Sequence, residues 1–413
     1  MSILVFEDGQ VENLYPITIG RPACAISCAG YRLVDWIERL QLPARAVLRP
    51  YLAEIFAIDY PMLSAPPAAG PHLLINARLV PSVANDHALR AMLNGGQAGL
   101  VKHNGATAAA LLPPDAPPPP VDLKTDQLDD YFNYAGVPGL PELPHTLPLF
   151  DYPHDVVRYN LETFSANIAH RLEQGGYREV ADGVFAADGA VLGEYVVSDT
   201  SNGPILLDRG AKIGPYCYLS GPAYIGPGTR VIEHSAIKDA VSLGHTTKIG
   251  GEVEASVVEP YSNKQHHGFL GHSYLGSWIN LGAGTCNSDL KNTYGAVKMD
   301  YHGEKIATGM QFVGCIMGDY SKSAINTGIF TGKTVGACSM VYGFVTTNVP
   351  SFVNYARLFG QVTELPPEVM IATQQRMFAR RNVEQRPCDV QLIHDMYQLT
   401  RDERQLAGEP LSL

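Results

Sequence analysis

An aliphatic residue recurs at every sixth position through a long stretch of this 413-residue chain. The series runs without a miss through Leu207, Ile213, Leu219, Ile225, Val231, Ile237, Leu243 and Ile249. A glycine often follows the aliphatic residue, and the spacing returns near residues 275–282 and 317–341. Three six-residue units, each a short strand with a tight turn, close one triangular coil with the aliphatic residue pointing inward. The period predicts a left-handed parallel β-helix; the alternative is a β-sandwich with scattered glycines.

Two segments interrupt this period, at residues 259–268 and 286–312. Loops that leave a rigid scaffold are the usual place for binding and catalytic residues. We therefore expect the chemistry of the β-helix to lie in or beside these two segments.

The first part of the chain has a different pattern, typical of an α/β layer with a parallel sheet. Apolar runs predict strands at 3–6 and 72–80, and helical spacing predicts a helix at 31–40. The run PPDAPPPP at 113–120 predicts an exposed loop, and residues 155–175 predict a helix that ends at Gly175-Gly176. After residue 350, helices are expected at 366–381 and 389–403.

These patterns predict three domains. An α/β domain of the Rossmann-like kind is expected over residues 1–175, a β-helix over 176–350 and a helical extension over 351–413.

The charge and cysteine content exclude several classes of protein. The formal net charge of −11 argues against a broad nucleic-acid-binding face. Gly and Pro total 70 residues, about 17% of the chain, below the level typical of disorder. Seven cysteines without framework spacing indicate a reducing compartment. Neither a signal peptide nor a transmembrane run is evident, so we expect a cytoplasmic protein with no membrane partner.

The stretch from His266 to Thr285 reads HHGFLGHSYLGSWINLGAGT. It resembles the acetyltransferase motif of the bifunctional bacterial enzymes that acetylate glucosamine 1-phosphate and uridylate the product. That motif has the form H-L-x-Y-(I/L)-G-D-x-x-(I/L)-G-x-x-(V/I)-N-(I/L)-G-A-G-T. The match keeps the first histidine and runs without a gap to Thr285.

The resemblance implies a role for each matching residue. His266 would be the general base, because acyl transfer from a thioester to an amine needs an unprotonated nucleophile. Asn280 would contact the acceptor sugar. Ala283, Gly284 and Ala337 would line the groove for acetyl-CoA or another acyl-CoA.

The chain also departs from this family. The two cations that anchor the sugar phosphate fall at Glu254 and Ala236, and the motif tyrosine becomes Phe269. Lys264 stands one residue from a further family lysine and is the candidate replacement anchor. We retain Lys264 and Phe269 as acceptor-site candidates.

The N-terminal stretches NLYPITIGRP (13–22) and LLINARLVP (73–81) resemble a divergent branch of sugar nucleotidyltransferases. Ordinary members hold the triphosphate in a glycine-rich loop, which is missing here. Arg21 is the candidate replacement cation. Asn76 follows a strand where the family places a metal-binding carboxylate. The resemblance would bring Mg²⁺ with a nucleoside triphosphate to this domain.

Other features have alternative interpretations. His267 and His272 show a spacing found in β-helical zinc enzymes, but no earlier histidine fits, so no metal site is predicted. The arginines near the C-terminus fit a solvated helix face better than a CoA phosphate site (Arg376, Arg380, Arg381, Arg386). Three cysteines of the repeat region are expected to be small core or turn residues (Cys286, Cys315, Cys338).

The resemblance implies a transferase of the sugar-nucleotide pathway, most simply an acyl-CoA-dependent acyltransferase acting on an amino sugar or its phosphate or nucleotide. Such β-helices usually form homotrimers with active sites between subunits. One alternative is nucleotidyl transfer alone, with the β-helix as a trimerisation scaffold. The other is a non-catalytic regulatory trimer that binds sugar nucleotides.

Overall fold

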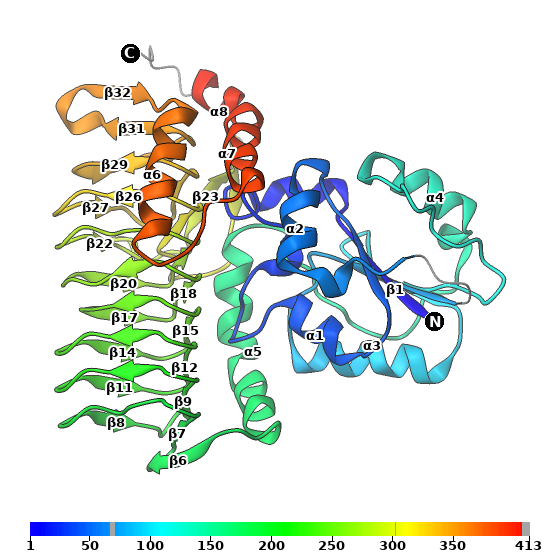
Figure 1. Ribbon diagram of the computed structural model, residues 1–413, viewed down its shortest axis with the longest axis horizontal. Helices are drawn as coiled ribbons and strands as arrows, with labels where there is room; N and C mark the ends of the chain where they lie inside the picture. Colours follow the sequence, from blue (N-terminus) through cyan, green and yellow to red (C-terminus); the bar gives the residue numbers. More distant parts are fainter. Residues whose placement is uncertain (67–70, 302, 407–413) are drawn as a thin grey trace. The chain divides into compact units, whose positions relative to one another are not determined.

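The computed structural model describes residues 1–66, 71–301 and 303–406 (Figure 1). The chain forms two compact units that interleave in sequence. The first unit comprises residues 1–14, 21–26 and 31–152. The second takes the short segments 15–20 and 27–30 and then the chain from Pro153 onward.

The first unit is built on a five-stranded sheet of order β2-β1-β3-β5-β4. Strand β1 is buried along its whole length, as expected for a central strand covered on both faces. Strands β2, β1 and β3 are parallel, but β5 runs antiparallel to β3 because β4 and β5 form a hairpin. The sheet is therefore mixed, whereas the sequence predicted a parallel one. The elements of this unit are β1 (Ser2–Phe6), α1 (Leu33–Arg39), β2 (Ala44–Val47), α2 (Ala53–Asp59), β3 (His72–Asn76), α3 (Val83–Gly95), β4 (Gly99–His103), β5 (Ala106–Leu111) and α4 (Leu128–Tyr134).

The second unit is a parallel β-solenoid whose short strands stack as successive rungs (Figure 1). Leu207 pairs with Ile225, and Ile225 with Leu243, so one coil takes eighteen residues, or three six-residue units. All eight positions of the unbroken aliphatic series are buried and belong to one continuous core. The predicted β-helix is confirmed.

The strands of the solenoid unit are β6 (Arg178–Ala181), β7 (Val184–Ala186), β8 (Val197–Asp199), β9 (Ile205–Leu207), β10 (Lys212–Ile213), β11 (Tyr218–Ser220), β12 (Ala223–Ile225), β13 (Arg230–Val231), β14 (Ala236–Lys238), β15 (Val241–Leu243), β16 (Lys248–Ile249), β17 (Glu252–Glu254), β18 (Val257–Val258), β19 (Asn263–Lys264), β20 (Phe269–Gly271), β21 (Tyr274–Leu275), β22 (Cys286–Asn287), β23 (Lys298–Tyr301), β24 (Glu304–Ala307), β25 (Cys315–Met317), β26 (Lys322–Ser323), β27 (Gly328–Ile329), β28 (Lys333–Val335), β29 (Met340–Val341), β30 (Phe344–Val345), β31 (Val353–Ala356) and β32 (Gln361–Glu364).

The two interruptions of the period differ in structure. Residues 259–268 stay within the solenoid and contain β19; Ile249 pairs there with Lys264, fifteen residues on instead of eighteen. The residues that the coil lacks fall between Ile249 and Val258. Residues 259–268 continue the solenoid at the six-residue spacing from Val258 through Lys264 to Leu270, and they are not a loop that leaves the scaffold. Residues 286–312 do contain an insertion, the antiparallel hairpin β23–β24.

Helices accompany the solenoid within its own unit. Helix α5 (His154–Glu173) ends before Gly175 and Gly176, both at positive φ, as predicted. Helix α6 (Pro367–Ala379) begins at a proline, also as predicted. The helix expected at 389–403 is divided into α7 (Pro387–Leu399) and α8 (Arg401–Leu406).

Short 3-10 helices complete the connections: η1 (Gly9–Leu14), η2 (Ala23–Ala25), η3 (Pro50–Leu52), η4 (Pro61–Leu63), η5 (Thr125–Gln127), η6 (Val137–Gly139) and η7 (Arg357–Phe359). None of the described helices is both long and apolar enough to cross a membrane.

Candidate functional site

The turn that carries His266 lies between β19 and β20 of the solenoid. Both His266 and His267 are exposed there. Gly284 lies eighteen residues after His266, and its N–H donates to the carbonyl of His267 at 3.0 Å. Coil stacking therefore places the two ends of the sequence motif on adjacent turns.

Glycine is required where these two turns meet. Gly268 has φ of +131°, and a Cβ there would collide with the carbonyl oxygen of Thr285. Only a residue without a side chain allows this close approach. The glycines of the motif thus shape the surface beside His266.

Lys264 holds the His266 turn from inside the solenoid. It pairs with Ile249 in the inward-facing row and is only 2% exposed. Its Nζ lies 2.7 Å from the carbonyl oxygen of Gly250, 2.6 Å from that of Gly268 and 3.3 Å from that of His266. Burial lowers the pKa of Lys264 to about 8.

These contacts occupy the three N–H donors of the ammonium group. Binding an acceptor phosphate with Lys264 would therefore require breaking a contact that shapes the turn. The position suits Lys264 to orient His266.

The other acceptor-site candidates lie near this turn. Asn280 is exposed and forms a bridge with Asn263, the residue that precedes Lys264. Phe269 opens β20 and is partly exposed, with its ring beside Gly271. Asn280 and Phe269 therefore stand on coils that carry or adjoin the His266 turn.

The three residues proposed for the acyl-CoA groove are not brought together. Ala283 and Gly284 lie on the turn stacked on residues 265–268, and both are partly exposed. Ala337 follows β28, which belongs to a different sheet, and is completely buried. Its N–H donates to Ser351 Oγ at 3.1 Å.

The segment 15–20 helps to cover the corner that contains Ala337. A Cβ at Gly318, next to Ala337, would lie 3.1 Å from Pro16 Cβ. Gly20 passes beside the carboxylate of Asp319 in the same way. Ala337 thus offers no surface to a ligand in this chain, while Ala283 and Gly284 do.

A histidine–carboxylate pair lies on the following corner, where sequence reasoning did not place it. His272 Nδ1 is 2.9 Å from Asp289 Oδ2, and the His272 ring stacks on Phe312 with centroids 5.1 Å apart. A carboxylate that fixes an imidazole is a common arrangement for a general base. Asp289 stands seventeen residues after His272, about one coil, which is the signal that could have revealed it.

Zinc-binding geometry is not found at these histidines. Within residues 1–66, 71–301 and 303–406, no three side chains of the His, Cys, Asp or Glu type gather as metal ligands would.

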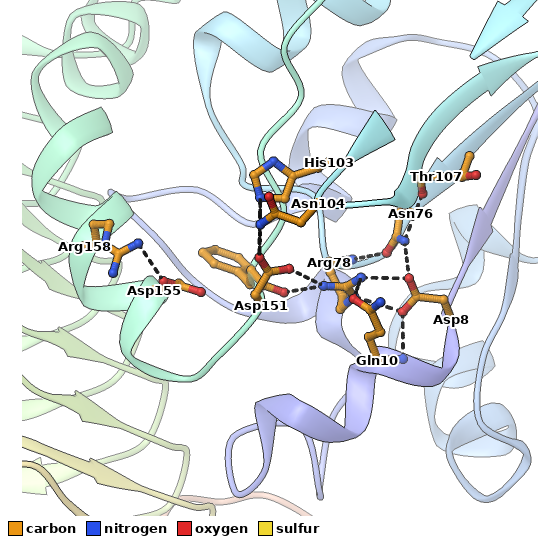
Figure 2. Close-up of polar contacts among 11 residues, drawn as sticks. Asp8, Gln10, Asn76, Arg78, His103, Asn104, Thr107, Asp151, Asp155 and Arg158 are labelled. Atoms are coloured by element: carbon orange, nitrogen blue, oxygen red, sulfur yellow. Dashed lines mark hydrogen bonds and ion pairs between the residues drawn. The ribbon is translucent and has the colours of Figure 1, made fainter. Parts of the chain in front are cut away.

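The first unit has its own polar cluster at the carboxyl ends of β1 and β3 (Figure 2). Ligands of open α/β sheets usually bind at such an edge. Asn76 is completely buried there; its Nδ2 donates to Asp8 Oδ2 at 2.8 Å and to the carbonyl of Thr107 at 3.1 Å. Its Oδ1 accepts the N–H of Arg78 at 3.0 Å.

Arg78 fills the centre of this cluster. Its side chain is fully buried, and all five of its N–H donors meet oxygen atoms (Figure 2). Two donors hold both carboxylate oxygens of Asp8, at 2.8 and 2.9 Å. The others reach Gln10 Oε1 at 2.9 Å, the Phe150 carbonyl at 2.7 Å and Asp151 Oδ1 at 3.1 Å.

The residues present do not fit a Mg²⁺ site. Magnesium is normally held by one or two carboxylates with water and substrate phosphates. Here a guanidinium already neutralises Asp8 and Asp151, and Asn76 has committed its amide to neighbours in the same cluster.

Arg21 lies in the same unit, where its carbonyl accepts Arg49 Nη2 at 3.0 Å. Arg49 also forms an ion pair with the buried Glu7, at 2.9 Å between Nε and Oε2. Arg21 is partly exposed. The structure therefore places Arg21 beside a buried ion pair, and its phosphate-binding role stays a prediction.

Comparisons with known proteins agree with the predicted resemblance to sugar nucleotidyltransferases and to bifunctional nucleotidyltransferase/acetyltransferases. Residues 3–174 match a family described as sugar nucleotidyl transferase. A bifunctional sugar-1-phosphate nucleotidylyltransferase/acetyltransferase of Sulfurisphaera tokodaii is 30% identical over 148 residues, covering 35% of this chain and 37% of that protein. The bifunctional protein GlmU of Cupriavidus pinatubonensis is 31% identical over 121 residues, covering 28% of this chain and 26% of that protein. The chain thus spans about a quarter to little more than a third of the length of these relatives.

Among solved structures, a UDP-N-acetylglucosamine acyltransferase of Francisella novicida superposes with a TM-score of 0.34 and 14% identity. The match covers 57% of this chain and 79% of that one.

Proposed function

We propose that this chain, a divergent member of the sugar nucleotidyl transferase family over residues 3–174, transfers an acyl group from acyl-CoA to an amino sugar on its β-solenoid. The observation that carries the proposal is the gap-free motif from His266 to Thr285, whose two ends lie on stacked turns joined by the Gly284–His267 hydrogen bond. The acceptor would be an amino sugar, its phosphate or its nucleotide.

The proposed chemistry assigns a task to each part of the turn. The acceptor nitrogen attacks the thioester carbonyl while His266 accepts one of its protons, which the departing CoA thiolate then takes up. The C–S bond breaks, the CoA thiolate leaves, and an amide forms. Backbone N–H groups of the glycine-rich turn at 282–284 are the candidate donors to the oxyanion. Lys264 keeps the turn in place, and Asn280 contacts the acceptor.

His272 is the second candidate for the base, because Asp289 holds its imidazole in one orientation. Variants of the two histidines distinguish the alternatives.

We further propose a cytoplasmic homotrimer. No disulfide joins any of the seven cysteines, all of which lie in the described part of the chain, and this suits a reducing compartment. Ala283 and Gly284 are partly exposed on one corner of the coil while Ala337 is buried, so the second wall of an acyl-CoA groove at this corner would come from another copy of the chain.

The first unit supports a second, separate proposal: that it binds a sugar nucleotide without a metal-dependent transfer. The ion pairs of Arg78 with Asp8 and Asp151 support the absence of metal-dependent transfer, and the match to the sugar nucleotidyl transferase family supports binding of a sugar nucleotide.

The experiment follows CoA release with a thiol reagent. The full chain is incubated with acetyl-CoA and either glucosamine 1-phosphate or a UDP-linked amino sugar. His266→Ala should lower kcat/KM by at least 100-fold, whereas His234→Ala, on an earlier coil, should change it less than threefold. A loss confined to His272→Ala would reassign the base. Full activity in both His266→Ala and His272→Ala would refute histidine catalysis at this site.

A parallel assay for pyrophosphate release from UTP and N-acetylglucosamine 1-phosphate tests the first unit. We expect no release above background with Mg²⁺ present. Metal-dependent release would refute the second proposal.

A further inference from the structure

Three cations stack in register on one outer face of the solenoid. Lys212 pairs with Arg230, and Arg230 pairs with Lys248, each in the outward position of its strand. Their neighbours Ile213, Val231 and Ile249 face inward and are buried. We call Lys212, Arg230 and Lys248 the basic ladder.

The basic ladder is electrostatically unfavourable by itself. Adjacent rungs of a parallel sheet lie about 4.8 Å apart, and like charges directly opposite each other destabilise a sheet. No carboxylate of the described residues forms an ion pair with any of the three, although the chain as a whole carries a charge of −11. The pKa of Lys248 is lowered by burial and then by three cations, Arg381, Arg230 and Arg380.

The end of helix α6 adds two more cations to this face. Arg380 forms the C-cap of α6, and Arg381 follows it. Arg381 donates through Nη2 to Asn263 Oδ1. Asn263 is the rung after Lys248, so Arg381 extends the positive face by one rung.

This face leads to the proposed catalytic turn. Asn263 forms a bridge with Asn280, and Lys264 and the His266 turn follow Asn263 in the chain. Three rungs separate Asn280 from Arg230, a span of about 14 Å at the usual strand spacing. A ligand of that length could have its reacting group at Asn280 and its charged end on the ladder.

We propose that Arg230, Lys248 and Arg381 bind the phosphate groups of a substrate whose reacting end lies at Asn280 and His266. The ligand class is a phosphate ester with two or more negative charges, which is either the nucleotide part of a UDP-linked acceptor or the phosphates of CoA. The inference rests on the proposed acyl transfer for the position of the reacting end. Guanidinium and ammonium groups bind phosphate oxygens through charge-assisted hydrogen bonds. The ladder would replace the family anchors absent at Ala236 and Glu254.

The test compares the natural chain with the double variant Arg230→Gln/Lys248→Gln. The control is Arg178→Gln/Arg209→Gln, which removes the same charge from exposed positions elsewhere on the solenoid. Affinity is measured by titration calorimetry with three probes: acetyl-CoA, UDP-N-acetylglucosamine and inorganic pyrophosphate.

The ladder variant should weaken the Kd for at least one nucleotide ligand and for pyrophosphate by tenfold or more, while the control changes each Kd less than twofold. Beside the loss with pyrophosphate, a loss with acetyl-CoA but not with UDP-N-acetylglucosamine identifies the donor as the ligand, and the opposite pattern identifies the acceptor. Both results support the proposal. Equal affinities of the ladder variant and the natural chain, or no binding of any probe by the natural chain, would overturn it.

These binding measurements do not require turnover. If acyl transfer fails in every assay while probe binding still depends on Arg230 and Lys248, the anion site stands and the proposed function fails. If acyl transfer occurs and the ladder variant has the Kd and KM values of the natural chain, the proposed function stands and the anion site fails.

Discussion

Lys264→Met tests whether a buried ammonium holds the His266 turn. Methionine keeps a similar length and suits the row between Ile249 and Leu281. The pKa of Lys264 is about 8 in the fold, against an ordinary value of 10.5. At about 1.4 kcal/mol per pH unit, keeping this lysine protonated in the fold costs about 3 kcal/mol at pH 7.

The sign of the pH dependence follows from this lowered pKa. The unfolded chain binds the proton more tightly, so folding releases it between pH 8 and pH 10.5. The cost is fully present below pH 8 and disappears as the pH rises through that window. Lys264 should therefore add about 2 kcal/mol to the free energy of unfolding between pH 7 and pH 9.5. Methionine in its place cannot add this increment.

The assay is urea unfolding at pH 7 and pH 9.5, followed by tryptophan fluorescence. Two tryptophans are present, so a Trp36→Phe background leaves Trp278 of the solenoid as the reporter. Lys212→Met, at an exposed rung, is the matched control. The rise in unfolding free energy with pH should be about 2 kcal/mol smaller in Lys264→Met than in either comparison protein. The same rise in all three would refute the reasoning.

Catalysis provides an independent measure of the same contacts. Removing the three Nζ contacts frees the turn, so Lys264→Met should lower kcat by about 10- to 100-fold, or about 1.4 to 3 kcal/mol. An unchanged kcat would show that His266 is held by other contacts.

Three other changes have defined outcomes. Gly268→Ala puts a Cβ against the Thr285 carbonyl at a φ that only glycine favours, so it should lower the free energy of unfolding in urea by about 2 kcal/mol. The control Gly189→Ala should cost less, because its Cβ would meet nothing closer than 3.8 Å. Equal costs would argue against the close approach. Arg78→Met should destabilise the first unit by about 3 kcal/mol and create a Mn²⁺ site detectable by calorimetry, because it leaves two carboxylates without their cation. Unchanged stability with no Mn²⁺ binding would contradict that account. Iodoacetamide should modify one cysteine in the native chain, the exposed Cys286, and all seven in urea, as counted by mass spectrometry. Rapid modification of a second thiol in the native chain would contradict the burial of the other six.

The repeat region was the most predictable part of the fold. Each aliphatic position of the series faces inward because the coil repeats every eighteen residues, and a fixed period translates directly into a stacked core. The shortened coil was harder to predict, since Lys264 occupies a position where the pattern calls for an aliphatic residue. A lysine in the inward row is explained by the carbonyl oxygens of Gly250, His266 and Gly268 around its Nζ, which the sequence pattern does not reveal.

The first unit was less predictable. The strand at β3 and the helix at α1 follow from apolar spacing. The antiparallel β5 depends on the hairpin turn at Asn104 and Gly105, both at positive φ, and this Asn-Gly pair is a strong hairpin signal that the prediction of a parallel sheet overlooked. The pairing of Arg78 with Asp8 and Asp151 joins residues some 70 positions apart, so no local pattern reveals it.

The segments 15–20 and 27–30 belong to the solenoid unit. In the sequence they alternate with residues 1–14, 21–26 and 31–152 of the other unit. No single cut of the chain therefore yields both units intact. A fragment that starts at Pro153 lacks the segment 15–20 that covers Gly318, and it would expose the corner of Ala337 to solvent. During synthesis, these two segments leave the ribosome early but complete their unit only after the last coils are made. The corner of Gly318 and Ala337 is then completed only when residues 15–20 pack on it, and a transplant of the proposed activity would have to carry these residues with the solenoid.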